Sequence, residues 1–242
     1  MFIDTHIHLD SKEYTADLDA VIKSAFDAGV KYFINPGSDL RSLDIIPRIC
    51  ENHPQILPAY GIHPHDAKDF DDKIYAKIKS LLQQKAVAVG ETGLDFHYNL
   101  SDPNIQKEVF MKHIYLAKEF DLPLIIHSRK AEEEIYDILK KEKISKGVVH
   151  CYSGTLDYAK RFVDMGLYIG ITGVITFNKA ENIRDLVKNI TIERLLTETD
   201  GPFLAPIPHR GKRNLPEYIP IIADKISQLA VLGSDPVLSK II

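Results

Sequence analysis

The chain has 242 residues, of which 45% are hydrophobic and 26% charged, and its formal net charge is −4. This composition is typical of a soluble globular protein, and we expect one domain over residues 1–242 because α/β barrels of this length are common. The net charge argues against a broad basic face that coats duplex DNA. No apolar run approaches the roughly 20 residues needed to span a bilayer, so we expect no membrane partner.

The two cysteines, Cys50 and Cys151, lie far apart and match neither a disulfide framework nor a CxxC metal knuckle. The N-terminus lacks the features of a signal peptide, because His6 and His8 fall where such a peptide is apolar. We therefore expect a cytoplasmic protein. No obligate protein partner is evident, and we expect a monomer.

Short apolar runs alternate with amphipathic stretches along the whole chain. The runs are apolar throughout, as in parallel strands buried on both faces. Strands are expected at residues 2–6, 30–35, 56–61, 86–91, 123–127, 147–150, 167–171 and 195–198. Helices are expected near residues 15–28, 40–52, 71–84, 103–120, 131–142, 155–165, 181–188 and 216–230.

Local signals mark the ends of two of these helices. Gly29 follows the first helix at the position where a glycine commonly stops one. Asp102 and Pro103 have the side chains expected at the N-cap and the first helical position of the fourth helix.

Eight strand–helix units predict a TIM (β/α)8 barrel. A doubly wound open sheet is the alternative, but the dinucleotide fingerprint GxGxxG is absent after the first strand.

Histidines and carboxylates gather at the ends of the predicted strands, where a TIM barrel carries its active site. Seven of the ten histidines lie at or soon after such an end: His6, His8, His63, His65, His127, His150 and His209. Histidine mixed with carboxylate is the ligand set of zinc, manganese or a mixed divalent pair. His6 and His8 alone would also fit a strand that leaves the core with two polar residues.

The strand ends supply more ligands than one catalytic zinc uses, and they suit two ions that share a carboxylate. Glu91, between the two groups of histidines, is the predicted bridge. The first and eighth strands are neighbours in a closed barrel, so His6, His8 and Asp200 are expected to complete one site. The adjacent fifth and sixth strands are expected to complete the other through His127 and His150.

Several segments together resemble the TatD family of metal-dependent deoxyribonucleases. They are Asp4-Thr5-His6-Ile7-His8, Gly90-Glu91-Thr92-Gly93-Leu94-Asp95, Ile126-His127-Ser128-Arg129, His150-Cys151-Tyr152-Ser153-Gly154 and Thr197-Glu198-Thr199-Asp200-Gly201-Pro202. Residues 204–214 are similar to that family's loop after the last strand. The resemblance extends to about residue 226. Family members usually continue into a further C-terminal helix, so we expect the last outer helix to be shortened.

The resemblance implies a TIM barrel of the metal-dependent hydrolase, amidohydrolase-like type with two divalent ions, of which Mg, Mn and Zn are candidates. It assigns His6, His8, Glu91 and Asp200 to one ion, and Glu91, His127 and His150 to the other. The implied activity is hydrolysis of DNA, often as a 3′–5′ exonuclease on single strands. Some similar proteins are linked to D-aminoacyl-tRNA deacylation, so a carboxylic ester or amide hydrolase is the alternative. A non-catalytic metal-binding module is a third interpretation.

The expected chemistry is hydrolysis of a phosphodiester by water held on the metal pair. Asp200 is expected to orient the water and take its proton. His63, Arg129 and Arg213 are candidates to bind phosphate oxygens, since arginine offers a bidentate fork. For Arg129 the alternative is a salt bridge with a glutamate of the following helix, Glu132 or Glu133.

Two aromatic side chains, Tyr152 and Phe203, are candidates to stack a terminal base, and burial in loop packing is their alternative. His65 is expected to be structural, and Cys151 to be inert packing.

Overall fold

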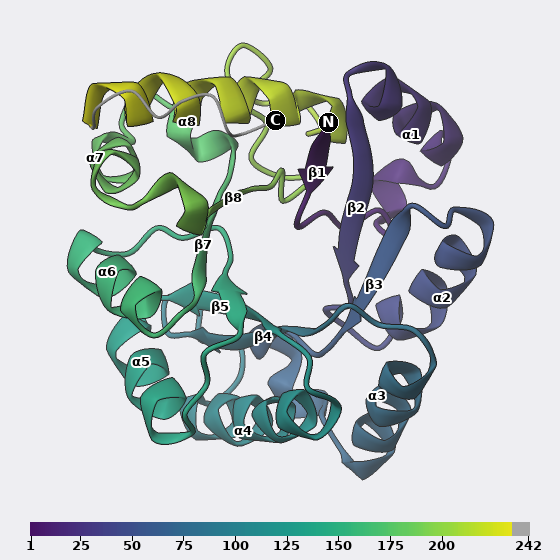
Figure 1. Cartoon of the computed structure of the whole chain (residues 1–242). Helices are drawn as coiled ribbons and strands as arrows, with labels where there is room; N and C mark the ends of the chain where they lie inside the picture. Colours follow the sequence, from purple (N-terminus) through teal and green to yellow (C-terminus); the bar gives the residue numbers. More distant parts are fainter. Residues whose placement is uncertain (234–242) are drawn as a thin grey trace.

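The computed structural model describes residues 1–233, so the part of the predicted domain at residues 234–242, on which the expected shortening of the last outer helix depends, lies outside the described residues. Eight parallel strands form a ring with helices outside it (Figure 1). The strands are β1 (Phe2–Asp4), β2 (Val30–Pro36), β3 (Ile56–Tyr60), β4 (Ala88–Asp95), β5 (Leu124–Arg129), β6 (Gly147–Val149), β7 (Tyr168–Ile171) and β8 (Leu195–Thr197). The helices are α1 (Leu18–Asp27), α2 (Ser42–Asn52), α3 (Asp72–Gln84), α4 (Pro103–Phe120), α5 (Glu132–Lys141), α6 (Leu156–Asp164), α7 (Glu181–Asn189) and α8 (Ile219–Gly233).

The first and last strands meet just beyond their C-terminal ends. The strands follow one another around the sheet in sequence order from β1 to β8. Beyond the ends of β1 and β8, the Asp200 N–H donates to the His6 carbonyl at 2.9 Å and the His8 N–H donates to the Gly201 carbonyl at 2.9 Å. The predicted TIM barrel is therefore confirmed, and His6, His8 and Asp200 lie where the ring closes.

A small cluster of apolar side chains stands apart from the main core. Its members come from six strands and are Ile34, Ala59, Ala88, Ile125, Val148 and Leu196. Side chains in a strand alternate with period two, so every second residue points the same way. His127 follows Ile125 at this spacing, and His150 follows Val148. The alternation that fills the barrel with apolar side chains thus also directs these two imidazoles into its interior.

The local signals read from the sequence act as predicted. The Asp102 carboxylate accepts a hydrogen bond from the Asn104 N–H at 2.8 Å, with Pro103 in the first turn of α4. Gly29 lies just beyond α1 with φ +89°, a conformation that glycine adopts at low cost.

All eight strands differ from their predicted bounds by at least one residue, and the differences at β1 and β4 have clear structural reasons. β1 ends at Asp4, because the Asp4 carboxylate accepts a hydrogen bond from the His6 N–H at 3.3 Å and the chain turns there. β4 extends to Asp95 instead of ending at Glu91. Its second half is polar and glycine-rich, yet every residue of the strand is buried. An apolar run was therefore too narrow a signal for β4.

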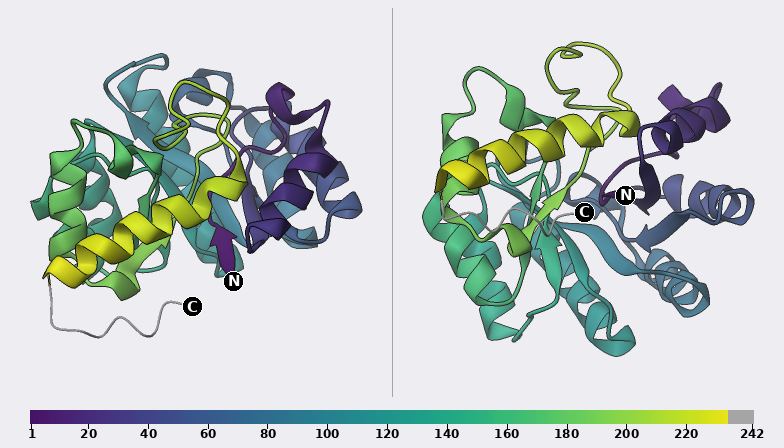
Figure 2. Two further views of the ribbon diagram at one scale, coloured as in Figure 1. Left: turned by 90° about the horizontal axis from the view of Figure 1, so that it is seen from above. Right: turned by 45° about the horizontal axis from the view of Figure 1, so that its top comes forward.

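The loop between β8 and α8 stands above the end of the barrel toward which the β1 arrow points (Figure 2). Among residues 1–233, no helix combines the length and apolar character needed to cross a bilayer.

Candidate metal centre

The six predicted metal ligands come together at the C-terminal end of the barrel. Five of them line a cavity of about 940 Å³, namely His8, Glu91, His127, His150 and Asp200. His6 is fully buried next to them.

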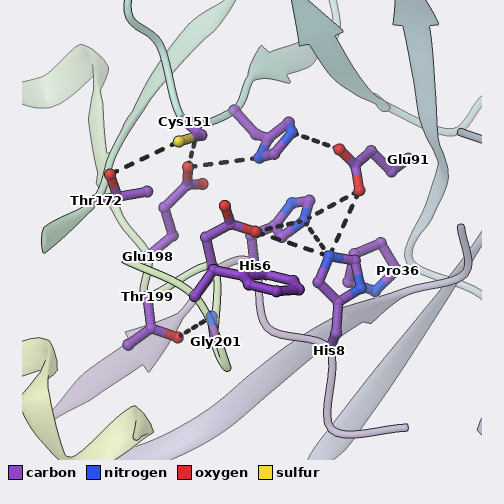
Figure 3. Close-up of polar contacts among 12 residues, drawn as sticks. His6, His8, Pro36, Glu91, Cys151, Thr172, Glu198, Thr199 and Gly201 are labelled. Carbon is purple, nitrogen blue, oxygen red and sulfur yellow. Dashed lines mark hydrogen bonds and ion pairs between the residues drawn. The ribbon is translucent and has the colours of Figure 1, made fainter. Parts of the chain in front are cut away.

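Glu91 contacts histidines of both groups, among them His6 and His8 (Figure 3). Its Oε2 is 3.5 Å from Nε2 of both His6 and His8. Its Oε1 is 2.6 Å from His150 Nε2 and 3.1 Å from His127 Nδ1. Each oxygen of one carboxylate thus faces a different pair of imidazoles, which is the arrangement of a bridging ligand.

The first group of donor atoms has the spacing of a metal site. His6 Nε2 and His8 Nε2 are 3.3 Å apart, and they lie 3.8 and 3.7 Å from Asp200 Oδ1. Glu91 Oε2 is 3.5 Å from each of the two imidazole nitrogens, so these five distances all lie between 3.3 and 3.8 Å. They are close to the ~3.4 Å expected between ligand atoms around a tetrahedral ion with ligand bonds of ~2.1 Å.

Burial favours the neutral, ligand-competent form of His6. Burial, helped by the neighbouring His150, lowers the pKa of His6 to about 3. The two rings stack with centroids 3.9 Å apart. Burial also raises the pKa of Asp200, partly offset by the imidazoles of His150 and His8.

Asp95 fixes the orientation of His127 in the second group. Asp95 Oδ2 is 3.1 Å from His127 Nε2 and 2.9 Å from His65 Nε2. Burial alone would raise the pKa of Asp95, but hydrogen bonds, first that from His127, hold it below its usual value. Because an ionised carboxylate only accepts, His127 carries its proton on Nε2. Its Nδ1 lone pair then points at Glu91, as in carboxylate–histidine–metal arrangements.

Glu198 is a buried carboxylate near His150 Nδ1, the ring nitrogen that does not face Glu91. Its Oε1 accepts a hydrogen bond from the Cys151 N–H and is 3.8 Å from His150 Nδ1 (Figure 3). Burial raises the pKa of Glu198 to about 8. Burial alone would lower the pKa of His150, but the neighbouring carboxylates, chiefly Glu91, raise it to about 9.

The pKa values of Glu91 and the imidazoles around it indicate whether these side chains can bind metal ions. Burial would raise the pKa of Glu91, but the imidazoles around it, His150 first, hold it well below its usual value. The two imidazoles that face Glu91 Oε1, His127 and His150, both have raised pKa values. The raised values mean that these imidazoles favour binding positive charge, a proton, beside the Glu91 carboxylate, and divalent ions can supply the same charge there. The residues therefore fit a metal centre.

His63 presents a hydrogen-bond donor to the metal centre. Its Nδ1 accepts the His65 N–H at 3.1 Å, so neutral His63 carries its proton on Nε2, 3.5 Å from Glu91 Oε1. Burial lowers the pKa of His63 well below its usual value. His63, Glu91 and His127 present ligand atoms within 4.8 Å of one another, but a protonated Nε2 cannot bind a metal.

Asp4 ties the first ligand pair to the last strand. Its carboxylate accepts hydrogen bonds from Thr199 N–H at 2.9 Å and Thr199 Oγ1 at 2.5 Å. Burial raises the pKa of Asp4 to about 7, against the hydrogen bonds from Thr199. These hydrogen bonds hold the residue just before Asp200 close to the segment just before His6.

Three exposed cations line the cavity: Arg41, which pairs with Asp10, and Arg129 and Lys130. The Arg129 guanidinium lies 5.0 Å from the centre of the Tyr98 ring. The alternative salt bridge with Glu132 or Glu133 does not occur among residues 1–233. Arg129 is therefore placed to meet an anion that enters the cavity.

The structure does not place Arg213 and Tyr152 for their predicted substrate contacts. Arg213 makes a two-pronged ion pair with Asp17, at 2.9 and 2.7 Å, and does not line the cavity. Tyr152 is 3% exposed and its hydroxyl donates to the Thr155 carbonyl at 2.7 Å. Asp17 takes up the Arg213 guanidinium that would have met a phosphate, and Tyr152 lines the cavity but is too buried to offer its ring face to a base.

Sequence reasoning missed the supporting carboxylates Asp4, Asp95 and Glu198. Each belongs to one of the motifs that follow apolar runs, and each is fully buried. Buried acids are rare unless paired, but burial at these positions depends on the closed barrel. The sequence signal available was only their place within the motifs.

Comparisons with known proteins agree with this geometry. A family model described as "TatD related DNase" matches residues 3–241. The uncharacterized metal-dependent hydrolase YabD of Bacillus subtilis is 40% identical, over 99% of this chain and 95% of its own length.

The 3′-5′ ssDNA/RNA exonuclease TatD of Escherichia fergusonii is 34% identical, over 93% of this chain and 90% of its own length. The crystal structure of YjjV, a TatD homologue from Escherichia coli, superposes with a TM-score of 0.88 at 33% identity. That match covers 94% of this chain and 90% of YjjV. The chain belongs to the TatD family and is a metal-dependent hydrolase.

Proposed function

We propose that this hydrolase is a deoxyribonuclease that removes nucleotides from single-stranded DNA in the 3′–5′ direction. The observation that carries the proposal is the Glu91 carboxylate, whose two oxygens face two separate donor groups beneath an open cavity. Paired divalent ions that share a carboxylate are typical of enzymes that cleave phosphate esters. The name of the Escherichia fergusonii relative supports the same activity.

Two divalent ions, with Mg, Mn and Zn as candidates, would be held by one chain. His6, His8 and Asp200 would hold the first, and Glu91 would bridge to the second, on His127 and His150. Such ions lower the pKa of water and neutralise charge on phosphoryl oxygens. Because one chain supplies every ligand, we propose that the enzyme acts as a monomer.

Asp200 accepts the proton of the attacking water in this proposal. Burial raises its pKa, which makes it a better base than an exposed carboxylate. The water oxygen forms a bond to phosphorus and one water proton passes to an Asp200 oxygen. The bond from phosphorus to the leaving oxygen breaks, and that oxygen keeps the electron pair and takes a proton from solvent. The His63 Nε2–H donates to a phosphate oxygen, because its proton is fixed on the side that faces the centre.

Arg129 and Lys130 at the rim of the cavity attract the phosphate groups of a nucleic acid strand. Arg129 and Lys130 are exposed at the mouth and form no ion pair among residues 1–233. With a net charge of −4 for the whole chain, this attraction is local. Both cysteines are free, which supports a cytoplasmic location.

One panel assay tests the proposal. Metal-reconstituted protein is incubated with end-labelled single-stranded DNA, duplex DNA and a D-aminoacyl-tRNA, with the Glu91→Ala variant as the blank. We expect shortening of the single strand from its 3′ end and no shortening with the blank. Release of the amino acid without DNA cleavage would instead identify the alternative, a deacylase.

A further inference from the structure

Two exposed aromatic side chains stand on opposite sides of the cavity mouth. Tyr98, after β4, is 54% exposed, and Phe203, after β8, is 59% exposed. Both line the cavity. Three strands separate β4 from β8 in either direction around the ring. The two side chains therefore lie across the metal centre from each other.

Tyr98 is held in place although it is exposed. Its N–H donates to Asp95 Oδ1 at 2.8 Å, so the carboxylate that orients His127 also anchors this loop. Its ring packs edge-on against His65, with centroids 5.6 Å apart, and meets the Arg129 guanidinium at 5.0 Å. The ring is thus a fixed feature of the rim.

Phe203 is anchored to the other side of the centre. Its N–H donates to the Asp200 carbonyl at 2.9 Å, and its carbonyl accepts a hydrogen bond from Asn214 Nδ2 at 2.6 Å. Asn214 is fully buried. Within residues 1–233 the Phe203 ring packs against no other aromatic ring. The fixed backbone therefore holds an apolar ring at the cavity, where an entering ligand would meet it.

The chemistry around Tyr98 matches a nucleotide. An aromatic ring offers a stacking surface to a base, and Arg129 and Lys130 beside it offer positive charge to a phosphate. The bases of a duplex are already stacked on their neighbours, whereas an unpaired base has a free face. Aromatic rings on both sides of the centre therefore suit a single strand that crosses it.

We infer that Tyr98 with Arg129 binds the base on one side of the scissile phosphate and that Phe203 binds the base on the other side. The substrate class is single-stranded nucleic acid with a nucleotide on each side of the broken bond. This inference rests on the proposed nuclease function and names the residues that make it select unpaired ends.

The test compares two single-stranded oligonucleotides, one intact and one with abasic sites at its two 3′-terminal positions. The wild-type protein should show a KM at least about ten-fold higher for the abasic strand, because stacking on the rings is lost. In the double variant Tyr98→Ala, Phe203→Ala, the ratio of the two KM values should fall toward one. Tyr98→Phe keeps the ring and should keep the ratio.

Tyr115→Ala is the matched control, because Tyr115 lies on α4, is 51% exposed and does not line the cavity. It should show the wild-type ratio. A wild-type ratio near one, or an unchanged ratio in the double variant, overturns the inference.

Methyl p-nitrophenyl phosphate separates this failure from failure of the proposed function, because it is a phosphodiester without a base. If wild-type protein cleaves it and the intact strand but ignores the loss of bases, only the inference fails. If it cleaves neither, the proposed nuclease function fails and the inference falls with it.

Discussion

Single carboxylates decide how the histidines of this centre are oriented. Asp95 accepts hydrogen bonds from both His65 and His127, and Glu198 lies behind His150. Neither acid faces the Glu91 oxygens directly. Asp95 acts by setting which ring nitrogen of His127 carries the proton, and therefore which lone pair is free for an ion. Glu198, 3.8 Å from His150 Nδ1, acts through its charge, which helps to raise the pKa of His150.

Replacing Asp95 with Asn should weaken the second ion. An amide oxygen accepts a hydrogen bond less strongly than a carboxylate, so His127 loses its fixed proton position. We expect metal affinity or activity at limiting metal to fall about 10- to 100-fold. Isothermal titration with the metal measures the affinity. Asp102→Asn is the matched control, because Asn also caps α4; equal affinities in the two variants would contradict the role of Asp95.

Replacing Asp200 with Asn separates proton transfer from metal binding. The amide oxygen can still contact a cation, but it cannot take a proton from water. We expect the variant to retain metal, as measured by elemental analysis, and kcat on single-stranded DNA to fall about 10²- to 10⁴-fold. A kcat equal to that of wild type would remove Asp200 from its role as base.

At the scale of elements, α4 fixes the segment that carries His63. His113 on α4 is fully buried; its Nε2 accepts the Ile62 N–H at 3.1 Å and its Nδ1 donates to the Val109 carbonyl at 2.8 Å. Protonation of Nε2 would break the bond to Ile62. Burial lowers the pKa of His113 to about 4.

His113 should make the folded protein less stable in mild acid. Between pH 6.5 and about pH 4 the unfolded chain binds a proton at His113 that the folded protein excludes, so stability falls as pH falls. The contribution reaches roughly 3 kcal/mol near pH 4. Urea unfolding from pH 7.5 to 5 should show a loss about 2 kcal/mol larger in wild type than in His113→Gln. Parallel pH curves for the two proteins would contradict the assignment.

The elements themselves were largely predictable from sequence. Apolar runs identified all eight strands, and the Asp102-Pro103 signal located the start of α4. The second half of β4 was not predictable, because residues 92–95 look like a polar turn. They are strand only because β5 pairs with them, Gly93 opposite His127 and Asp95 opposite Arg129. That partner lies more than thirty residues away in the sequence.

The candidate site was predictable where strand ends identified it and unpredictable where partners were distant. Spacing and strand order brought His6, His8 and Asp200 together correctly. Arg213, by contrast, pairs with Asp17, far away in the chain. A substrate contact at Tyr98 was not predictable from the sequence, because only the closed barrel places this exposed side chain beside the cavity.

At the scale of the whole molecule, the metal centre joins strands that are distant in sequence. Its proposed ligands lie within β4 and β5 and just after β1, β6 and β8. Each lies at or just beyond its strand, and no single helix or hairpin contains the site. Metal ions bind this site in the folded barrel in preference to the unfolded chain. Metal binding therefore stabilises the fold in addition to supporting the reaction.

Removal of metal should therefore lower the thermal stability of wild-type protein. At a free metal concentration about 100 times Kd, binding contributes about 2.7 kcal/mol. For a chain of this size, that corresponds to a fall in Tm of about 5–10 °C on addition of a chelator. Differential scanning calorimetry measures it. Glu91→Ala should show little change, and an equal chelator effect in both proteins would contradict metal binding at this centre.

The central claim is that two ions bridged by Glu91 carry out hydrolysis of single-stranded DNA. The most direct measurement titrates metal into metal-free protein and follows both bound metal and the rate of cleavage of an end-labelled single strand. The account predicts that cleavage rises to its maximum at two ions per chain and stays at background in Glu91→Ala. Full cleavage at one ion per chain, or cleavage by Glu91→Ala at the wild-type rate, would contradict it.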